Sequence, residues 1–144
     1  MSRPFHATVR QKPMFPMSRD QHSWAATAFH LAVDSFIKFP DVNTFNYLTE
    51  EMAIINAAAA KVFSNRKEAV WASLFKQYDI LQAIYDRQIT GSPAVATDAE
   101  AKIIIGNCKT IDPALKRIPW SIYQECRNNI EVVIEDTLCQ TQTA

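Results

Sequence analysis

The stretch NRKEAVWASLFKQYDILQAIYDRQITGSP, residues 65–93, decides the fold class. Most of its apolar residues recur at intervals of three and four, which is the period of an amphipathic helix. The residues of this stripe are Val70, Leu74, Tyr78, Leu81 and Tyr85. Asn65 is expected to cap the helix at its start, and the Gly91-Ser92-Pro93 sequence is expected to end it.

The apolar stripe of this helix is wide. Trp71, Phe75 and Ile84 lie beside the main stripe and extend it around the helix. Because apolar helix faces are normally covered by other elements, this width predicts a central helix with neighbours on two sides. Leu74 and Leu81 lie on the stripe and are therefore expected to be buried.

Capping sequences and prolines predict four further helices around this one. Ser18 with Gln21, and Thr97 with Glu100, have the spacing of a capping box at a helix start. The first of these helices is expected over residues 19–38. The second is expected to start at Asp41 or Asn43 and to end near Phe63 or Ser64. The last two are expected from residue 98 to about 117 and from Pro119 to about Leu138.

The Asp112-Pro113 sequence leaves the helix that follows Thr97 open to two interpretations. Asp112 could cap a new helix that has Pro113 at its first position. Alternatively, the proline could kink one longer helix. Both interpretations keep the chain all-α.

Composition agrees with an all-α fold. The chain contains only two glycines, Gly91 and Gly106, whereas all-β chains usually need many turn glycines. The length of 144 residues fits a single domain. We expect about five helices in a compact antiparallel bundle over residues 18–139, preceded by an extended arm over 1–17 and followed by a frayed tail over 140–144.

The N-terminal arm is expected to be extended because it contains three prolines. Residues 1–19 carry four basic side chains and no acidic one, although the formal net charge of the whole chain is zero. The arm therefore favours contact with an acidic surface, which could belong to its own body, a sister subunit or a partner. The candidate interface residues are Arg3, Phe5, Arg10, Lys12, Phe15 and Arg19, with Trp120 and Tyr123 on the last helix as further candidates.

The sequence lacks the common motifs of catalysis, cofactor binding and metal binding. It has no phosphate-binding loop, no His-Glu-x-x-His or Glu-x-x-His pair, and no Gly-x-Ser-x-Gly turn. His22 and His30 stand eight residues apart, which is too far for one metal ion, while His30 and Asp34 are close enough to pair. We therefore predict a non-enzymatic protein without cofactor, metal or catalytic residues.

Cysteine usage and hydropathy predict where the protein resides. Cys108, Cys126 and Cys139 are odd in number and include no Cys-x-x-Cys pair, so reduced thiols in the cytoplasm are expected. Residues 1–20 lack the continuous apolar stretch of a signal peptide. No run of apolar residues is long enough to suggest a membrane span.

The order of elements supports a comparison with a known class of proteins. A basic Arg-Pro-Phe…Lys-Pro arm leads into a helix, two apolar helices follow, and a Gly-x-Pro loop precedes a capped helix that runs to Ile118-Pro119. In this order the chain resembles small uncharacterised helical proteins of proteobacterial prophages and other mobile elements, over most of its length. The resemblance implies a phage or mobile-element context but no activity or site residues.

Small single-domain proteins from that context often bind and block a host protein, and inhibitors of CRISPR effectors are one such class. The resemblance therefore implies a protein-binding module that docks on a host complex. A homodimer is a further expectation. The alternative is a nucleic-acid-associated helical protein, because basic groups interleaved with aromatic side chains can bind phosphates and stack on bases.

Overall fold

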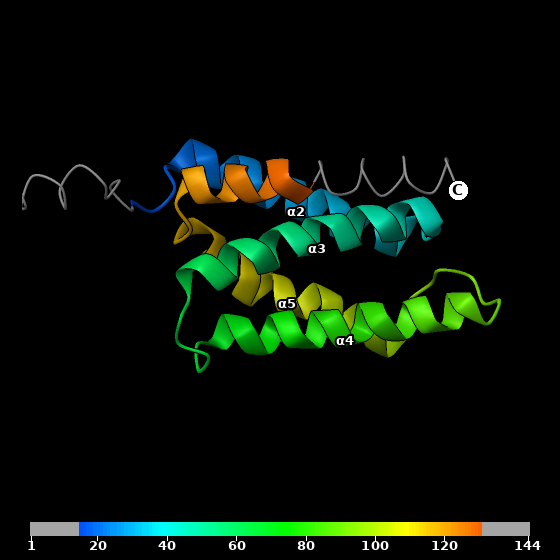
Figure 1. Ribbon diagram of the computed structural model, residues 1–144. Coiled ribbons are helices and arrows are strands. Elements are labelled where there is room, and N and C mark those ends of the chain that lie inside the picture. The colour runs from blue at the N-terminus through cyan, green and yellow to red at the C-terminus, as the bar shows by residue number, and fades with distance from the viewer. Residues whose placement is uncertain (1–14, 131–144) are drawn as a thin grey trace, which may run out of the picture.

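The computed structural model describes residues 15–130, and within this range the chain is all-α, as predicted. The helices are α2 (Arg19–Lys38), α3 (Val42–Val62), α4 (Ala69–Ile89) and α5 (Asp98–Lys116), and residues 120–130 form a further helical segment. Figure 1 shows these helices side by side along roughly one direction, joined by short connections. Most of the predicted arm and all of the predicted tail lie outside the described residues.

Three helices begin at capping boxes. The Ser18 and Thr97 side chains accept hydrogen bonds from the backbone N–H of Gln21 and Glu100, as the sequence predicted. Asp41, and not Asn43, caps α3, and its reciprocal partner is the Thr44 hydroxyl. These local bonds satisfy backbone donors that a helix start would otherwise leave without partners.

The prediction that Asn65 caps α4 is wrong. Glu68 stands at the N-cap position and makes no side-chain capping bond. The Asn65 side chain instead accepts a hydrogen bond of 3.0 Å from the backbone N–H of Lys67. Asn65 therefore stabilises a turn before the helix. An asparagine side chain can stabilise a turn or cap a helix, because the same side-chain oxygen accepts the hydrogen bond in both cases.

Glycine and proline act differently at the two ends of the α4–α5 hairpin. Gly91 ends α4 with a φ of 100°, in the left-handed region, and Ser92 N–H donates to the Arg87 carbonyl at 2.9 Å. Pro113 lies inside α5, which continues to Lys116, so the longer-helix interpretation of the Asp112-Pro113 sequence is confirmed. The chain then turns, and the next helical segment starts after Pro119.

Packing makes α2 and α5 the middle of the bundle. Helix α2 packs closely against α3 and α5, and α5 packs against α4, but no comparably close packing joins α3 to α4. The prediction that the 69–89 helix is central is therefore wrong, because α4 lies at an edge with one close neighbour. In Figure 1, α3 and α4 lie in front of α5.

The core is apolar and continuous. Leu74 and Leu81 are buried, as predicted, and they join the aliphatic and aromatic side chains of the other helices in one cluster. Its largest fully buried members include Phe29, Phe36, Leu48, Ile84, Ile104 and Ile111. None of the helices described is both long and apolar enough to span a membrane.

Candidate protein-binding surface

Helix α4 presents a row of largely apolar side chains to solvent. The exposed fractions are 54% for Phe75, 58% for Tyr78, 50% for Tyr85 and 67% for Ile89. Gln82 is also exposed and lies between the two tyrosines on the same face. We call these five residues the α4 row.

The opposite face of α4 explains why this row points outward. Gln77 is fully buried against α5, where its Oε1 accepts a hydrogen bond of 2.7 Å from Asn107 Nδ2. At the start of the helix, Trp71 Nε1 donates to the Phe63 carbonyl at 3.1 Å. A buried polar group needs its partner, so these two bonds fix the rotation of α4 about its axis.

A groove lies beside the α4 row, between α4 and α3. Its volume is about 230 Å³, and none of the described residues that line it carries a charge. Tyr78, Gln82 and Tyr85 belong to both the groove and the row. The other lining residues are Phe45, Thr49, Met52, Ala53, Asn56 and Leu81. The row and the groove therefore form one continuous surface.

The α3 wall of this groove consists partly of short side chains. Thr49, Ala53 and Asn56 follow one another at intervals of four and three residues, so they share one face of α3. Short side chains allow another backbone to approach a helix closely. The groove is therefore bounded by a low wall on α3 and a tall aromatic wall on α4.

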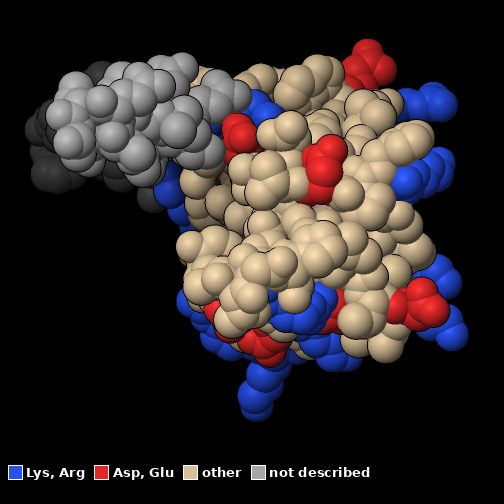
Figure 2. Space-filling model, turned by 90° about the vertical axis from the view of Figure 1, so that its right-hand side faces the viewer, with Lys and Arg blue, Asp and Glu red and all other residues tan. Residues whose placement is uncertain are grey.

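The apolar surface extends to one end of the bundle. Figure 2 looks onto the end that carries the α2–α3 and α4–α5 connections and shows a mostly uncharged face. Exposed apolar residues of these connections and their flanks are Phe39, Val42, Ile89 and Val95. Ile89 belongs to this end and to the α4 row, so it links the two.

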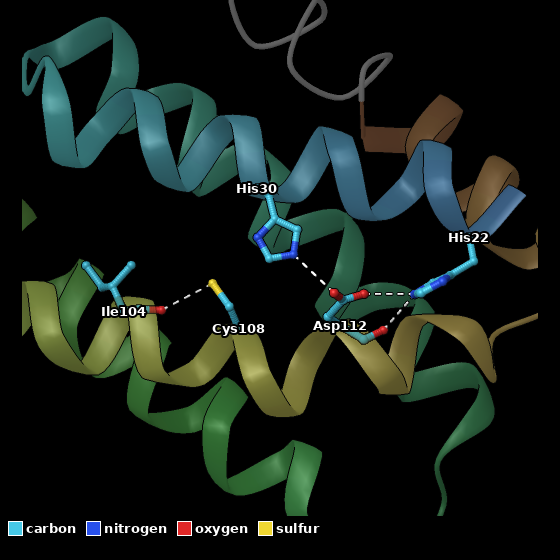
Figure 3. A network of polar contacts seen from close by, with 5 residues as sticks. All are labelled: His22, His30, Ile104, Cys108 and Asp112. Carbon is cyan, nitrogen blue, oxygen red and sulfur yellow. Dashed lines mark hydrogen bonds and ion pairs between the residues drawn. The ribbon is translucent and has the colours of Figure 1, made fainter. Parts of the chain in front are cut away.

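Apart from the α4 row and its groove, a cluster of polar side chains joins α2 to α5. His22 Nε2 lies 2.8 Å from Asp112 Oδ1, and His30 Nε2 lies 3.2 Å from Asp112 Oδ2. His22 Nε2 is also 3.0 Å from the Asp112 carbonyl oxygen. Figure 3 shows both rings pointing at the one carboxylate from α2. His30 therefore pairs with Asp112, and not with Asp34 as the sequence suggested.

The His22–Asp112–His30 cluster is best explained as a set of polar contacts that hold α2 against α5. Within residues 15–130, no group of three or more His, Cys, Asp or Glu side chains could hold a metal ion. Cys108 lies one turn before Asp112, but its Sγ donates to the Ile104 carbonyl at 3.6 Å (Figure 3). Burial, together with the carboxylates of Asp34 and Asp112, raises the pKa of this thiol to about 11. At neutral pH it is therefore protonated and a poor nucleophile.

A third cluster holds the 120–130 segment against α3. The Arg127 guanidinium donates to both Glu51 carboxylate oxygens, at 2.7 and 2.8 Å, and to the Tyr123 hydroxyl at 2.8 Å. Burial lowers the pKa of Arg127, but the hydrogen bonds to Glu51 and Tyr123 outweigh it, so the pKa lies above its ordinary value. Trp24 covers the guanidinium at 5.0 Å, so the pair is largely shielded from water.

The structure separates the interface residues named from the sequence. Arg3, Phe5, Arg10 and Lys12 lie outside the described residues, whereas Phe15 and Arg19 are exposed where the described chain begins. Tyr123 is 2% exposed and faces the interior, and Trp120 is half-buried and stacks on it with ring centroids 5.5 Å apart. The last helical segment therefore uses these two aromatic rings in packing.

Sequence reasoning assigned most of the α4 row to the core. Tyr78 and Tyr85 were placed on the buried stripe, with Phe75 beside it, but the structure exposes all three. The signal that could have found the surface was the width of the stripe. The width of the stripe predicts two neighbouring helices for α4. Helix α5 packs against one side of α4, and the side that carries the row is open.

Comparison with family models, curated proteins and solved structures finds no match to this chain.

Proposed function

We propose that the protein is a non-enzymatic protein-binding module that docks an amphipathic helix of another polypeptide on the α4 row and its groove. The observation that carries this proposal is the exposed, uncharged surface formed by Phe75, Tyr78 and Tyr85 beside a groove of about 230 Å³. Monomeric soluble proteins rarely expose contiguous apolar patches of more than a few hundred Å². Patches above that size usually mark interaction sites.

A helix fits this surface better than an extended strand. Residues 75, 78, 82, 85 and 89 are spaced at alternating intervals of three and four, which is the seam of a coiled coil. The groove beside them runs between two helices, and its α3 wall is low at Ala53. Helix-in-groove recognition uses these features: apolar anchors at helical spacing and a hydrophobic channel.

The charges beside the α4 row favour protein over nucleic acid on this surface. Asp79 and Asp86 are exposed on α4 next to the row, and carboxylates repel phosphates. The nucleic-acid alternative depends on Arg3, Arg10 and Lys12, which lie outside the described residues. The resemblance to prophage-encoded helical proteins adds a host complex, such as a CRISPR-type effector, as one possible source of the bound helix.

Site-specific photocrosslinking in the native host tests the proposal. We expect p-benzoylphenylalanine in place of Tyr78 to form a defined crosslinked protein product, because a docked helix would lie against that ring. The matched control places the same group at Ile105 on α5, which is 51% exposed and distant in sequence from the row. The docking surface is wrong if Tyr78 gives no product, or the same products as Ile105.

A further inference from the structure

We infer that the solvent-facing side of α5 binds the phosphate backbone of a duplex nucleic acid through a line of lysines. These lysines are Lys102, Lys109 and Lys116, and we call them the α5 stripe. The α5 stripe and the α4 row lie on different helices and share no residue, so this inference does not depend on the proposed function.

The three lysines of the α5 stripe lie along one side of the helix. All three are exposed, and they follow one another at intervals of seven residues, which is close to two helical turns. Successive lysines are therefore about 10 Å apart along the helix axis. The buried residues of α5 are Ile104, Asn107, Cys108, Ile111, Ala114 and Leu115. Because these residues form the side that faces the other helices, the stripe faces solvent.

The positive charge of the α5 stripe is not compensated by the rest of the described chain. None of the three ammonium groups makes an ion pair within residues 15–130. Two of the three acidic side chains of α5 already have partners: Glu100 accepts hydrogen bonds of 2.6 and 3.0 Å from Arg87, and Asp112 contacts two histidines of α2. The third, Asp98, is the first residue of α5 and lies at one end of the stripe. This face therefore carries a net positive charge.

Further basic groups lie at the Lys116 end of the α5 stripe. The backbone N–H of Met17 donates to the Lys116 carbonyl at 2.9 Å, so the chain before α2 passes beside the stripe. Arg19 is exposed two residues later. Residues 1–14 add three basic side chains and no acidic one: Arg3, Arg10 and Lys12. A polyanion on the stripe would therefore meet more positive charge beyond Lys116.

Lys76 on α4 widens the positive face. Ala69 of α4 and Pro113 of α5 line one depression of about 330 Å³, so this side of α4 adjoins the solvent-facing side of α5. Lys76 follows Ala69 by seven residues and therefore lies on the same side of α4. It is exposed and makes no ion pair with the other described residues.

The side chains of α5 favour a duplex over three other kinds of partner. Lysine is depleted in protein–protein interfaces, whereas lysines are common contacts of the phosphate backbone. Helix α5 contains no aromatic residue, so it offers no platform on which unpaired bases could stack. It also exposes no Trp, Phe or Leu, the residues that anchor a basic helix in a membrane surface. A regular row of phosphates is the partner that needs only a line of positive charge.

Fluorescence anisotropy with a mixed-sequence DNA duplex, measured over a salt series, tests the inference on the full chain. Affinity should fall steeply with salt, because bound phosphates release counterions. Each of Lys102→Gln, Lys109→Gln and Lys116→Gln should reduce the slope of log affinity against log salt by about 0.9, and the triple variant by about three times that amount. The matched control is Lys38→Gln, which removes an exposed charge from the end of α2 and should leave the slope unchanged.

Lysine acetylation followed by mass spectrometry tests where the duplex lies. A saturating concentration of the duplex should slow acetylation of Lys109 and Lys116 several-fold and leave Lys38 unaffected. Equal protection of all three lysines would contradict binding along the stripe.

Several outcomes would overturn the inference. One is no binding of the duplex at low salt, and another is an unchanged slope in the triple variant, which would place the contact away from the stripe. Tighter binding of a single strand of the same length would exclude the duplex as the preferred partner. Binding to vesicles of anionic lipid without binding to the duplex would identify a membrane surface instead. None of these outcomes bears on the Tyr78 photocrosslink, so the two proposals can fail separately.

Discussion

Replacing Glu51 by alanine is expected to lower the free energy of unfolding by about 3–5 kcal/mol, because it leaves a buried guanidinium unpaired. The Glu51 side chain is 4% exposed and the Arg127 side chain 15%, and the carboxylate accepts two of the hydrogen bonds of Arg127. Urea denaturation of the full chain, followed by far-ultraviolet circular dichroism, measures the loss.

Two controls separate the buried pair from ordinary surface charge. Lys61→Ala removes an exposed pair with Glu125 at 3.5 Å and is expected to cost less than about 1 kcal/mol. The double variant Glu51→Leu/Arg127→Met should recover most of the lost stability, because apolar residues often replace a buried pair without cost. If Glu51→Ala costs no more than Lys61→Ala, the 120–130 segment is not held by this pair.

Truncating Leu74 to alanine is expected to destabilise the protein by about 2–5 kcal/mol, since the change opens a cavity in the core. Leu74 is 1% exposed and lies on the inward side of α4. The matched variant on the same helix is Tyr78→Ala, which truncates a side chain that is 58% exposed. Measured on dilute protein, its effect should stay within about 0.5 kcal/mol, as is usual for surface substitutions.

This pair of variants tests the rotation of α4 about its axis. Comparable losses at Leu74 and Tyr78 would mean that the α4 row is part of the core, as the sequence alone suggested. A large loss at Leu74 with almost none at Tyr78 supports the outward row. Thermal melting monitored by circular dichroism gives an independent reading of the same comparison.

Helix positions could be predicted from the sequence because their signals are local. The Ser18 and Thr97 capping boxes connect residues only three apart, and both were found with their helix ranges. Asn65 misled the prediction because an asparagine side chain can cap a helix or stabilise a turn with the same oxygen. The local sequence does not decide between those two uses.

The arrangement of helix faces could not be predicted in the same way. His22 and His30 are separated from Asp112 by 90 and 82 residues in the sequence. No rule of helix spacing connects residues so far apart. The outward rotation of α4 depends on the contact between Gln77 and Asn107, which are 30 residues apart. An apolar stripe indicates that a face will be covered, but not whether the cover comes from the same chain.

Radical footprinting tests the docking surface most directly, because it reads the exposure of single side chains. Oxidation of Phe75, Tyr78 and Tyr85 is compared between dilute purified protein and the intact native host, with Leu31 on α2, which is 53% exposed, as the internal reference. A covered α4 row predicts that these three side chains are oxidised several-fold less in the host, relative to Leu31. Equal relative oxidation in both conditions would contradict the account, since nothing would then occupy the surface.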